Sequence, residues 1–552
     1  MKGESHMSAA PSEAFTLTGD DPAAGRERRW APPFFHETVL LAGVVLYAAR
    51  YWLYWDRFVE GTMDEAIWIP LAMKWNDATI FAQDPFVPVV LPFFPVAYTW
   101  LMASMLTLWP DPGTVLLLSS SALLAIYAAG VYWLARLIVE HRLAALLIAF
   151  VSLRVNVDLS GTGWGIYLGN AMPRAFLFAA TPWIGGLFIQ RVRSAARLAW
   201  VGVALGVVGN LHPLSALHLY LLMTGAILLT EGPDTRLSRW SSFTGGLAVG
   251  ILPYLLQWAQ VRDVTPLRME ILRFRADVQS FPQWDVIIRH LLSSYLPPCL
   301  IAAVGWRCLR SPQDRDRAEA SIRLALVAVT CTALGPLLAW LVPRLFAVHL
   351  LRMSGYVFLL CLLLSGFVVR ELLRRGTGMM TAAGYGLAVV LFLTAGGGRI
   401  GEMVQWATGT SSKTMTALGA DVGAREGGET DKQAFLDLCR WARSQTDRDA
   451  LFLAPPKRFA SFRIYAERAL FVTFKDGAVT VFSGRSAEDW YERYREAARL
   501  YQAFQPDAVI ALSQRHGIGY VVQESTRRAV DLPVVYENHR YRVYRVPAPE
   551  RA

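Results

Sequence analysis

The stretch TVLLLSSSALLAIYAAGVYWLARLI, from Thr114 to Ile138, decides the fold class of this chain. Its 25 residues include a single charged side chain, Arg136, and a helix needs roughly 20 mostly apolar residues to cross a bilayer. Similar stretches recur between Thr38 and Gly396. Because the backbone must satisfy its own polar groups in lipid, such stretches should be helical. The sequence predicts an α-helical polytopic membrane protein with about eleven transmembrane helices.

The composition of the whole chain agrees with this class. Of its 552 residues, 54% are hydrophobic and 18% are charged, whereas about a quarter of an ordinary soluble domain is charged. The net charge of +10 would suggest nucleic acid as a partner of a soluble protein. In a membrane protein, excess Lys and Arg is typical of inner loops, and it also suits an anionic lipid substrate. We therefore expect the lipid bilayer as a partner and no nucleic acid.

Changes in polarity divide the chain into four parts. We expect a disordered cytoplasmic tail over 1–36, a transmembrane domain over 37–396, a Gly-rich and Ser-rich linker over 397–430, and a small α/β domain over 431–552. Apolar periodicity in the last part predicts helices at 431–444 and 487–501, and strands at 450–453, 469–474, 520–523, 532–536 and 541–546. With the single cysteine Cys439, this part can hold no internal disulfide.

The distribution of Lys and Arg predicts the orientation, because short inner loops are enriched in both. The tail is basic and the segment 56–88 is acidic, which places the tail inside and that segment outside. The segment Val89–Pro110 admits two placements. If it spans, Arg136 and Arg142 fall outside and every later loop has the wrong charge. We expect it at the outer surface, which gives a large first outer loop over 56–113 and an outer C-terminal domain. The basic loops at 136–142, 307–323 and 370–375 then fall inside, and 156–173 falls outside.

The acidic pair Asp64–Glu65 is the most informative chemical feature of that loop. It follows the aromatic end of the first helix by a few residues, so it should lie just above the membrane. A carboxylate there can take a proton from a hydroxyl group or hold a divalent cation. The alternative is structural: a solvated loop pair, or an Asp that caps the helix that follows.

Basic groups at the predicted outer ends of helices are candidates for binding phosphate. They are Arg174, Arg352 with His349 three residues before it, and His212 at an outer turn. An ionisable residue in a membrane segment suggests function by default, and phosphate is bound by positive charge. The alternatives are arginines that snorkel to the interface and a packed, hydrogen-bonded His212. A further outer loop, 261–285, carries four arginines and four acidic residues, so we expect a self-paired, solvated surface there, with a diphosphate clamp as the alternative.

In layout the chain resembles the GT-C superfamily of membrane glycosyltransferases, which use polyprenyl-phosphate-linked sugars. The resemblance rests on Met63-Asp64-Glu65-Ala66-Ile67-Trp68 after the first helix and on Asp84-Pro85-Phe86-Val87-Pro88 downstream. Protein O-mannosyltransferases and lipid A aminoarabinose transferases carry an Asp-Glu pair in this loop. The strings Phe474-Lys475-Asp476, 489–493 and 532–538 look like the extracytoplasmic tails of bacterial members.

The resemblance implies a transferase of the bacterial inner (plasma) membrane that moves a sugar from a polyprenyl-phosphate carrier to a glycan, lipid or protein acceptor. Asp64 would be the catalytic base or a ligand of Mg²⁺ or Mn²⁺, with Glu65 assisting it. No other cofactor is expected. The carrier phosphate would be bound by Arg174, His212, His349 and Arg352. In the C-terminal domain, we expect Lys475 and Arg493 to be structural or to touch the acceptor.

Departures from the family pattern leave alternatives open. Ile67 and Trp68 stand where aminoarabinose transferases have Arg and Tyr, and the Trp-Trp-Asp-Tyr-Gly signature of oligosaccharyltransferases is absent. The sugar and the acceptor therefore stay open, and so does a non-catalytic relative. A transporter or lipid-binding protein is the other alternative. A transporter should show paired halves with broken helices, whereas here the acidic residues gather at one surface, which favours an enzyme.

Overall fold

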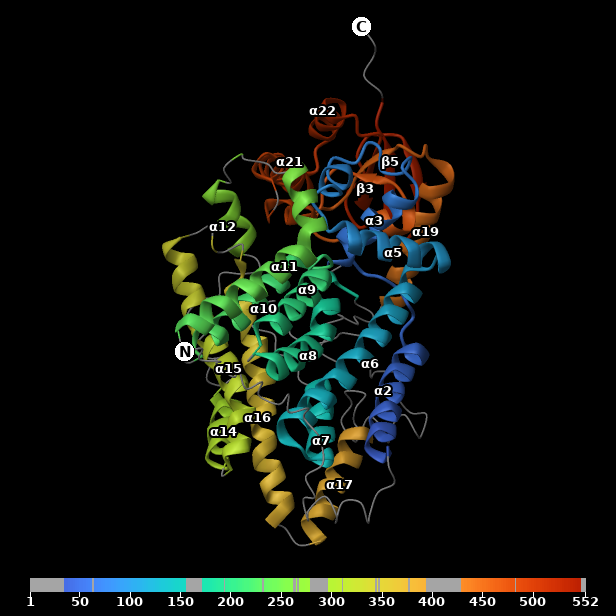
Figure 1. Ribbon diagram of the computed structural model, residues 1–552. Helices are drawn as coiled ribbons and strands as arrows, with labels where there is room; N and C mark the ends of the chain where they lie inside the picture. Colours follow the sequence, from blue (N-terminus) through green and yellow to red (C-terminus); the bar gives the residue numbers. More distant parts are fainter. Residues whose placement is uncertain are drawn as a thin grey trace, which may run out of the picture.

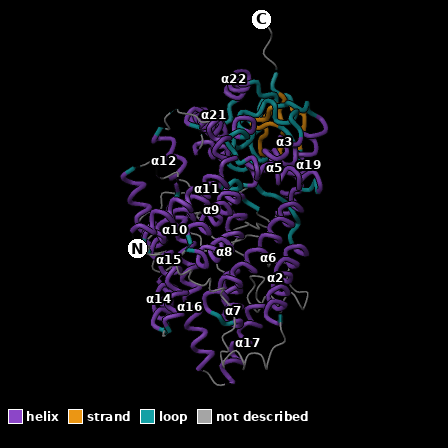
Figure 2. The backbone as a smooth tube through the Cα atoms, in the orientation of Figure 1, coloured by secondary structure: helices purple, strands orange, loops and turns teal. Residues whose placement is uncertain are grey.

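The computed structural model describes residues 34–61, 64–154, 171–192, 194–230, 233–261, 265, 268–277, 296–309, 311–342, 345, 348–375, 378–393, 428–481 and 483–547. Most of the predicted tail and linker lies outside these residues, and so does most of the outer segment predicted at 156–173. Figure 1 shows a bundle of helices that carries the C-terminal domain at one end. Figure 2 shows that the strands are confined to that end.

The described part of the chain before the C-terminal domain is mainly helical. In order the helices are α2 (Phe35–Tyr54), α3 (Glu65–Asn76), α4 (Val87–Val90), α5 (Val96–Leu108), α6 (Pro112–Val139), α7 (Arg142–Arg154), α8 (Pro173–Arg191), α9 (Ala195–Gly209), α10 (Pro213–Leu228), α11 (Pro233–Val261), α12 (Met269–Asp277), α14 (Leu296–Arg307), α15 (Pro312–Leu341), the 3-10 helix η3 (Leu350–Met353), α16 (Ser354–Arg375) and α17 (Gly378–Leu393).

Three helical segments among the described residues are long and apolar enough to cross a membrane. They are Pro112–Val139, Pro312–Gly335 and Leu350–Arg375, and shorter apolar helices accompany them. The chain is therefore a helical membrane protein. The predicted total of about eleven spans exceeds what these segments show and stays a prediction.

Loops that the sequence places on the inner side meet at one end of the bundle. Arg370 of α16 donates two hydrogen bonds, of 2.8 and 2.7 Å, to the carboxylate of Asp314 at the start of α15. It also donates to the carbonyl of Val139 at the end of α6, at 3.2 Å. Next to that carbonyl, Glu140 pairs with Arg317 of α15. In Figure 1 these helix ends lie opposite the C-terminal domain.

The short helices α3 and α5 lie beside the C-terminal domain (Figure 1). Trp68 and Ile69 of α3 are buried against Tyr98 and Met102 of α5. With 13 residues, α5 is shorter than the roughly 20 residues that a span needs. This agrees with the surface placement that the charge pattern predicts for the segment Val89–Pro110.

The C-terminal domain is a mixed five-stranded sheet with helices, as its predicted α/β class requires. Its elements are α19 (Gly428–Gln445), β1 (Leu451–Leu453), α20 (Phe462–Ala466), β2 (Ala469–Leu470), the 3-10 helix η5 (Phe474–Val481), α21 (Gly484–Ala503), α22 (Pro506–His516), β3 (Tyr520–Glu524), β4 (Val534–Glu537) and β5 (Tyr541–Arg545). The strand order is β2-β1-β3-β5-β4. The β2-β1-β3 part is parallel, and β5 pairs antiparallel with both β3 and β4.

The first loop, defined as residues 56–113, and the C-terminal domain share one hydrophobic core. Leu71 of α3 and Phe86 and Val90 of the α4 region are buried together with Leu453 and Trp490 of the C-terminal domain. Burying apolar surface is the dominant favourable contribution to association. The two segments, far apart in the sequence, therefore form a single packed unit.

A close backbone approach fixes the same contact. Phe58 stacks on Tyr465 with ring centroids 5.3 Å apart, and the Tyr465 hydroxyl accepts a 2.7 Å hydrogen bond from the amide of Val59. Gly61 has a φ of +70°, and a Cβ there would stand 2.7 Å from the backbone nitrogen of Ser461. Glycine supplies both the left-handed conformation and the space.

Glycines also let α9 and α11 pack backbone to backbone within the bundle. A Cβ at Gly202 would lie 2.2 Å from the carbonyl oxygen of Phe243, and a Cβ at Gly246 would lie 2.0 Å from that of Ala199. Small residues at helix interfaces are a common means of helix association in membranes. A Cβ at the neighbouring Gly245 would meet nothing within 4 Å, so only one of the two adjacent glycines serves the contact.

Candidate functional site

Asp64 and Glu65 stand at the start of α3, at the end of the bundle that carries the C-terminal domain. Asp64 is exposed and occupies the N-cap position, yet its side chain makes no capping hydrogen bond. Glu65 is the first residue of the helix and is buried. The alternative in which the Asp64 side chain caps the helix is therefore wrong. Asp64 is therefore exposed and stands next to a buried second carboxylate.

The position of α3 is fixed by α5, which also links it to the next part of the site. Trp68 of α3 packs edge to face on Tyr98 of α5, with ring centroids 5.7 Å apart. The Tyr98 hydroxyl donates a 2.6 Å hydrogen bond to the carbonyl of Ala171, just before α8. Three residues later comes Arg174. One continuous chain of buried contacts thus joins the acidic pair to the first of the candidate arginines.

Arg174 and Arg352 come together at this end of the bundle. Arg174, in the first turn of α8, is buried and its Nη2 lies 3.4 Å from the sulfur of Met172. Arg352 belongs to η3, and its Nε is buried with no hydrogen-bond partner among the described residues. Arg352 is close enough to Arg174 and Asp64 for their charges to interact. Because Arg174 is buried, it does not extend to the interface as a snorkelling arginine would. The buried N–H of Arg352 has no acceptor, which costs free energy, and an oxygen atom of a ligand would recover it.

The two candidate histidines lie beside these arginines. His212 is the N-cap of α10, where its Nδ1 accepts a 3.2 Å hydrogen bond from the amide of Ser215. The Nδ1 atom of His212 is therefore hydrogen-bonded within the protein, as the structural alternative for this residue expects. His349 precedes η3 with a φ of +47°. His212 lies within electrostatic reach of Arg174, Arg352 and His349, so the sequence-derived phosphate ligands form one group.

Two further cations lie within electrostatic reach of Asp64: Lys475 of the C-terminal domain and Arg275 of α12. Lys475 lies on η5 of the C-terminal domain, and Arg275 lies on α12 with its guanidinium 4.3 Å from the ring centroid of Phe474. Burial lowers the pKa of both side chains, that of Arg275 to about 10, while the negative charge of Asp64 acts in the opposite direction on each. The sequence offers Arg275 only through the alternative of a diphosphate clamp at 261–285, and Lys475 only as a structural or acceptor-contacting residue, because no local pattern links η5 or α12 to α3.

The sequence-derived candidates thus lie at the same end of the bundle, within electrostatic reach of one another. We call the group the charged cluster; its members are Asp64, Glu65, Arg174, His212, Arg275, His349, Arg352 and Lys475. The cluster contains four cationic side chains, those of Arg174, Arg275, Arg352 and Lys475, and two carboxylates, those of Asp64 and Glu65. Such an arrangement can bind a phosphate group by its cations, while the exposed carboxylate of Asp64 remains available as a base.

A buried ion cluster of three side chains lies next to Lys475. Arg463 is 1% exposed. It donates hydrogen bonds of 2.7 Å to Asp84 and of 2.7 and 3.1 Å to Asp476. Although burial acts against it, the charges of Asp476 and Asp84 raise the pKa of Arg463 above its ordinary value. We call this group the buried triad.

The second oxygen of Asp84 has a structural role as well. It accepts 3.0 Å hydrogen bonds from the amides of Phe86 and Val87. The Asp-Pro-Phe string that supports the family resemblance therefore acts here by fixing the first loop to the C-terminal domain.

Two residues at the start of α12 pair with the C-terminal domain. Arg268 makes a 2.7 Å ion pair with Glu488 of α21. The hydroxyl of Tyr491 donates a 2.7 Å hydrogen bond to Glu270. These two contacts differ from the expected pairing within the loop, because α21 supplies the partners, whereas the exposure of Arg268 and Glu270 agrees with a solvated surface.

Metal ligands are not gathered in the part of the chain that the structure describes. No group of three or more His, Cys, Asp or Glu side chains comes together among those residues. The divalent cation at Asp64 stays a prediction.

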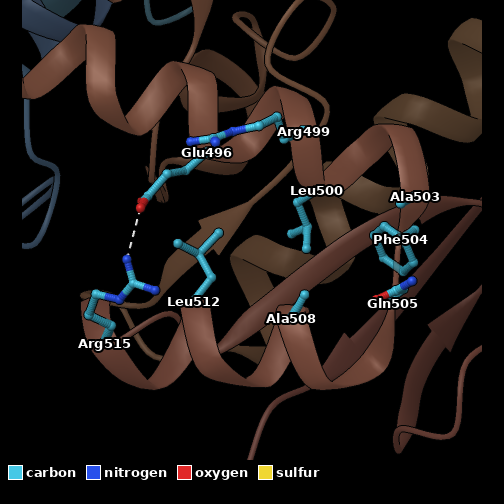
Figure 3. A pocket seen from close by; sticks show the side chains of 9 residues that line it. All are labelled: Glu496, Arg499, Leu500, Ala503, Phe504, Gln505, Ala508, Leu512 and Arg515. Atoms are coloured by element: carbon cyan, nitrogen blue, oxygen red, sulfur yellow. Dashed lines mark hydrogen bonds and ion pairs between the residues drawn. The ribbon is translucent and has the colours of Figure 1, made fainter.

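A shallow pocket of about 260 Å³ lies elsewhere, between α21 and α22 (Figure 3). Leu500, Phe504 and Leu512 line it, and an ion pair of 2.8 Å between Arg515 and Glu496 lies at one side. Ligand pockets usually hold about 300–1,000 Å³. The pocket is small and shares no residue with the charged cluster, so it gives no second candidate site.

Comparison with known proteins concerns the C-terminal domain. No curated protein matches the chain. Residues 433–497 match a family described as a domain of unknown function, DUF6798. The matched segment runs from α19 into α21 and so includes Lys475 and two members of the buried triad, Arg463 and Asp476. The chain is therefore similar, over part of its C-terminal domain, to a family whose description names no activity.

Proposed function

We propose that the protein is a membrane glycosyltransferase that moves a sugar from a polyprenyl-phosphate carrier to an acceptor on the extracytoplasmic face. One observation carries the proposal. The six residues selected from the sequence as base or phosphate ligands belong to four separate segments, at α3, α8, α10 and η3, and all lie in the charged cluster.

The chemistry of sugar transfer suits this arrangement. An acceptor hydroxyl attacks the anomeric carbon, the bond from that carbon to the phosphate oxygen breaks, and direct displacement inverts the anomeric centre. The hydroxyl proton goes to Asp64, which is exposed and so can be reached by an acceptor. The carrier phosphate leaves with added negative charge, which Arg174 and Arg352 stabilise.

The proposal includes an orientation. The tail would lie in the cytoplasm and the charged cluster and C-terminal domain outside, in a bacterial plasma membrane crossed about eleven times. The distribution of Lys and Arg supports this orientation. The contacts among Val139, Asp314 and Arg370 support it too, because they join predicted inner loops at the end opposite the cluster.

The test is sugar transfer from a polyprenyl-phosphate donor by purified variants. Asp64→Asn is nearly isosteric and removes the base, so we expect turnover to fall about 100- to 10,000-fold. Arg352→Ala removes charge that faces the phosphate, so donor binding should weaken as well. Asp77→Asn is the matched control, because Asp77 ends the same helix and pairs with Arg448 at the surface.

The results separate the proposal from its alternatives. Wild-type turnover by Asp64→Asn at unchanged thermal stability would show that the base is another group. A wild-type protein that binds polyprenyl phosphate but transfers no sugar from any such donor would be a non-catalytic lipid-binding protein.

A further inference from the structure

The backbone that carries Lys475 is held on both sides. On one side, the ring of Phe474 packs against Trp490 and Tyr494 of α21, with ring centroids 6.2 and 5.6 Å apart. On the other side, Asp476 is fixed by Arg463 of the buried triad. The 3-10 helix η5 itself contacts both α3 and α12. Lys475 therefore stands on a rigid support beside the helix that begins at Glu65.

The charges around Lys475 are out of balance. Arg275 and Arg174 lie within electrostatic reach of Lys475, as do Asp64 and Glu65. The nearest other carboxylate in sequence, that of Asp476, is already paired with Arg463. Four cations of the charged cluster thus share two carboxylates, and like charges that gather in a partly buried site repel one another.

Hydrogen-bond donors without an acceptor indicate which kind of ligand would neutralise the excess positive charge. Within the described residues, Nη1 of Arg275 and Nε of Arg352 are buried without a hydrogen-bond partner. Across the same residues, the Lys475 ammonium forms no ion pair and no hydrogen bond. These donors come from α12, η3 and η5, and a ligand with several negatively charged oxygens would satisfy them together. A phosphate monoester has three such oxygens and up to two negative charges.

We propose that Lys475 and Arg275 contact the phosphate of the lipid carrier together with Arg174 and Arg352, so that the C-terminal domain completes the phosphate site. The buried triad acts as a positioning group, which holds η5 and hence Lys475 over α3. The inference rests on the proposed function for the identity of the ligand as a polyprenyl phosphate.

The experiment measures binding of the carrier without any transfer step. Purified full-length protein is titrated with polyprenyl phosphate, with polyprenol and with inorganic phosphate, and affinity is read from the ligand-induced shift in Tm. We expect polyprenyl phosphate to bind more tightly than the other two. Lys475→Ala should lose about 10- to 100-fold in affinity, the range for one hydrogen bond between charged groups. Lys475→Arg should retain most of it.

A matched control separates a local effect from a general loss of positive charge. Lys457→Ala removes the same charge from an exposed position of the same domain, and we expect it to bind polyprenyl phosphate as the wild type does. Equal weakening by Lys457→Ala and Lys475→Ala would overturn the inference, because it would show that only net charge matters.

The positioning role of the triad has its own test. Asp476→Asn keeps the shape of the side chain and weakens the hold on Arg463. If the triad acts through Lys475, the double variant with Lys475→Ala should bind no more weakly than Lys475→Ala alone. Losses that simply add would show a merely structural role and overturn this part.

The outcomes also distinguish the inference from the proposed function. If Lys475→Ala binds polyprenyl phosphate as the wild type does while Arg352→Ala does not, the inference fails and the proposed function stands. If the wild type binds none of the three probes, both fail. If inorganic phosphate binds as tightly as polyprenyl phosphate, the ligand is not the lipid carrier.

Discussion

At the scale of single residues, hydrogen bonding separates structural carboxylates from chemical ones. Asp84 and Asp476 are buried and receive donors from Arg463 and from backbone amides. Asp64 is exposed and leaves the helix amides uncapped. Sequence spacing alone gives no such distinction, because each of these residues is an Asp close to the start of a short helical segment.

The buried triad should dominate the stability of the contact between the first loop and the C-terminal domain. Arg463→Met keeps the volume and leaves two carboxylates buried without their cation, so we expect a loss of about 3–5 kcal/mol. Denaturant unfolding of the full-length protein measures it.

The control for this prediction is an exposed ion pair in the same domain. Arg515→Met removes the partner of Glu496, and exposed pairs contribute no more than about 1 kcal/mol. Equal losses for the two variants would mean that the triad does not hold the contact.

At the residue scale the sequence predicts the candidates of the site but not its full membership. Asp64 and Arg352 can be found because charge is rare at the ends of apolar helices. Lys475 cannot be found in this way, since it belongs to a domain where charged side chains are common. It joins the site only because Phe474 and Asp476 are packed against distant parts of the chain.

At the scale of helices and strands, two adjacent glycines of α11 give a sharp test of packing. Gly246→Ala should force α9 and α11 apart, because the added Cβ would stand 2.0 Å from the carbonyl oxygen of Ala199. Gly245→Ala meets open space and should be neutral or slightly stabilising, since Ala favours helix by about 0.5–1 kcal/mol over Gly.

Thermal unfolding of the two variants in the same detergent measures this difference. A lower Tm for Gly246→Ala alone supports the packing. The same Tm for both variants would contradict it, because the two substitutions add the same methyl group one residue apart.

Periodicity predicted most of the elements, and its failures have physical reasons. The amphipathic helix at 487–501 and the strands near 451, 520, 534 and 541 are found close to their predicted positions. The predicted strand at 469–474 shrinks to β2, because the buried triad draws the chain into η5. Helix α22 was not predicted, although Pro506 at its start and Gly517 after its end are ordinary helix boundaries.

At the scale of the whole molecule, the predicted orientation can be tested with an exposed thiol. Cys439 is only 1% exposed, so it should not react in the folded protein. Gln502 lies on an exposed face of α21. A Gln502→Cys variant should react with a membrane-impermeant thiol reagent in intact spheroplasts, because the domain is expected outside.

Wild-type protein is the background control for this labelling, since it carries the same five native cysteines. Reaction of the variant only after lysis would place the domain inside and remove the basis for an extracytoplasmic site. The composition alone predicted a membrane protein with a separate polar domain. It could not predict that this domain shares a core with the first loop, because that contact depends on the folded path of the chain.

The shared core has a consequence for genetics. Leu71, Phe86 and Val90 pack against the C-terminal domain. A nonsense mutation in the linker would remove that domain and expose these apolar side chains of the first loop to solvent. Such a truncated product would be a target for proteolysis, not a shorter enzyme. The two segments should therefore be inherited together, and fusing the C-terminal domain to an unrelated membrane anchor should not transfer its properties.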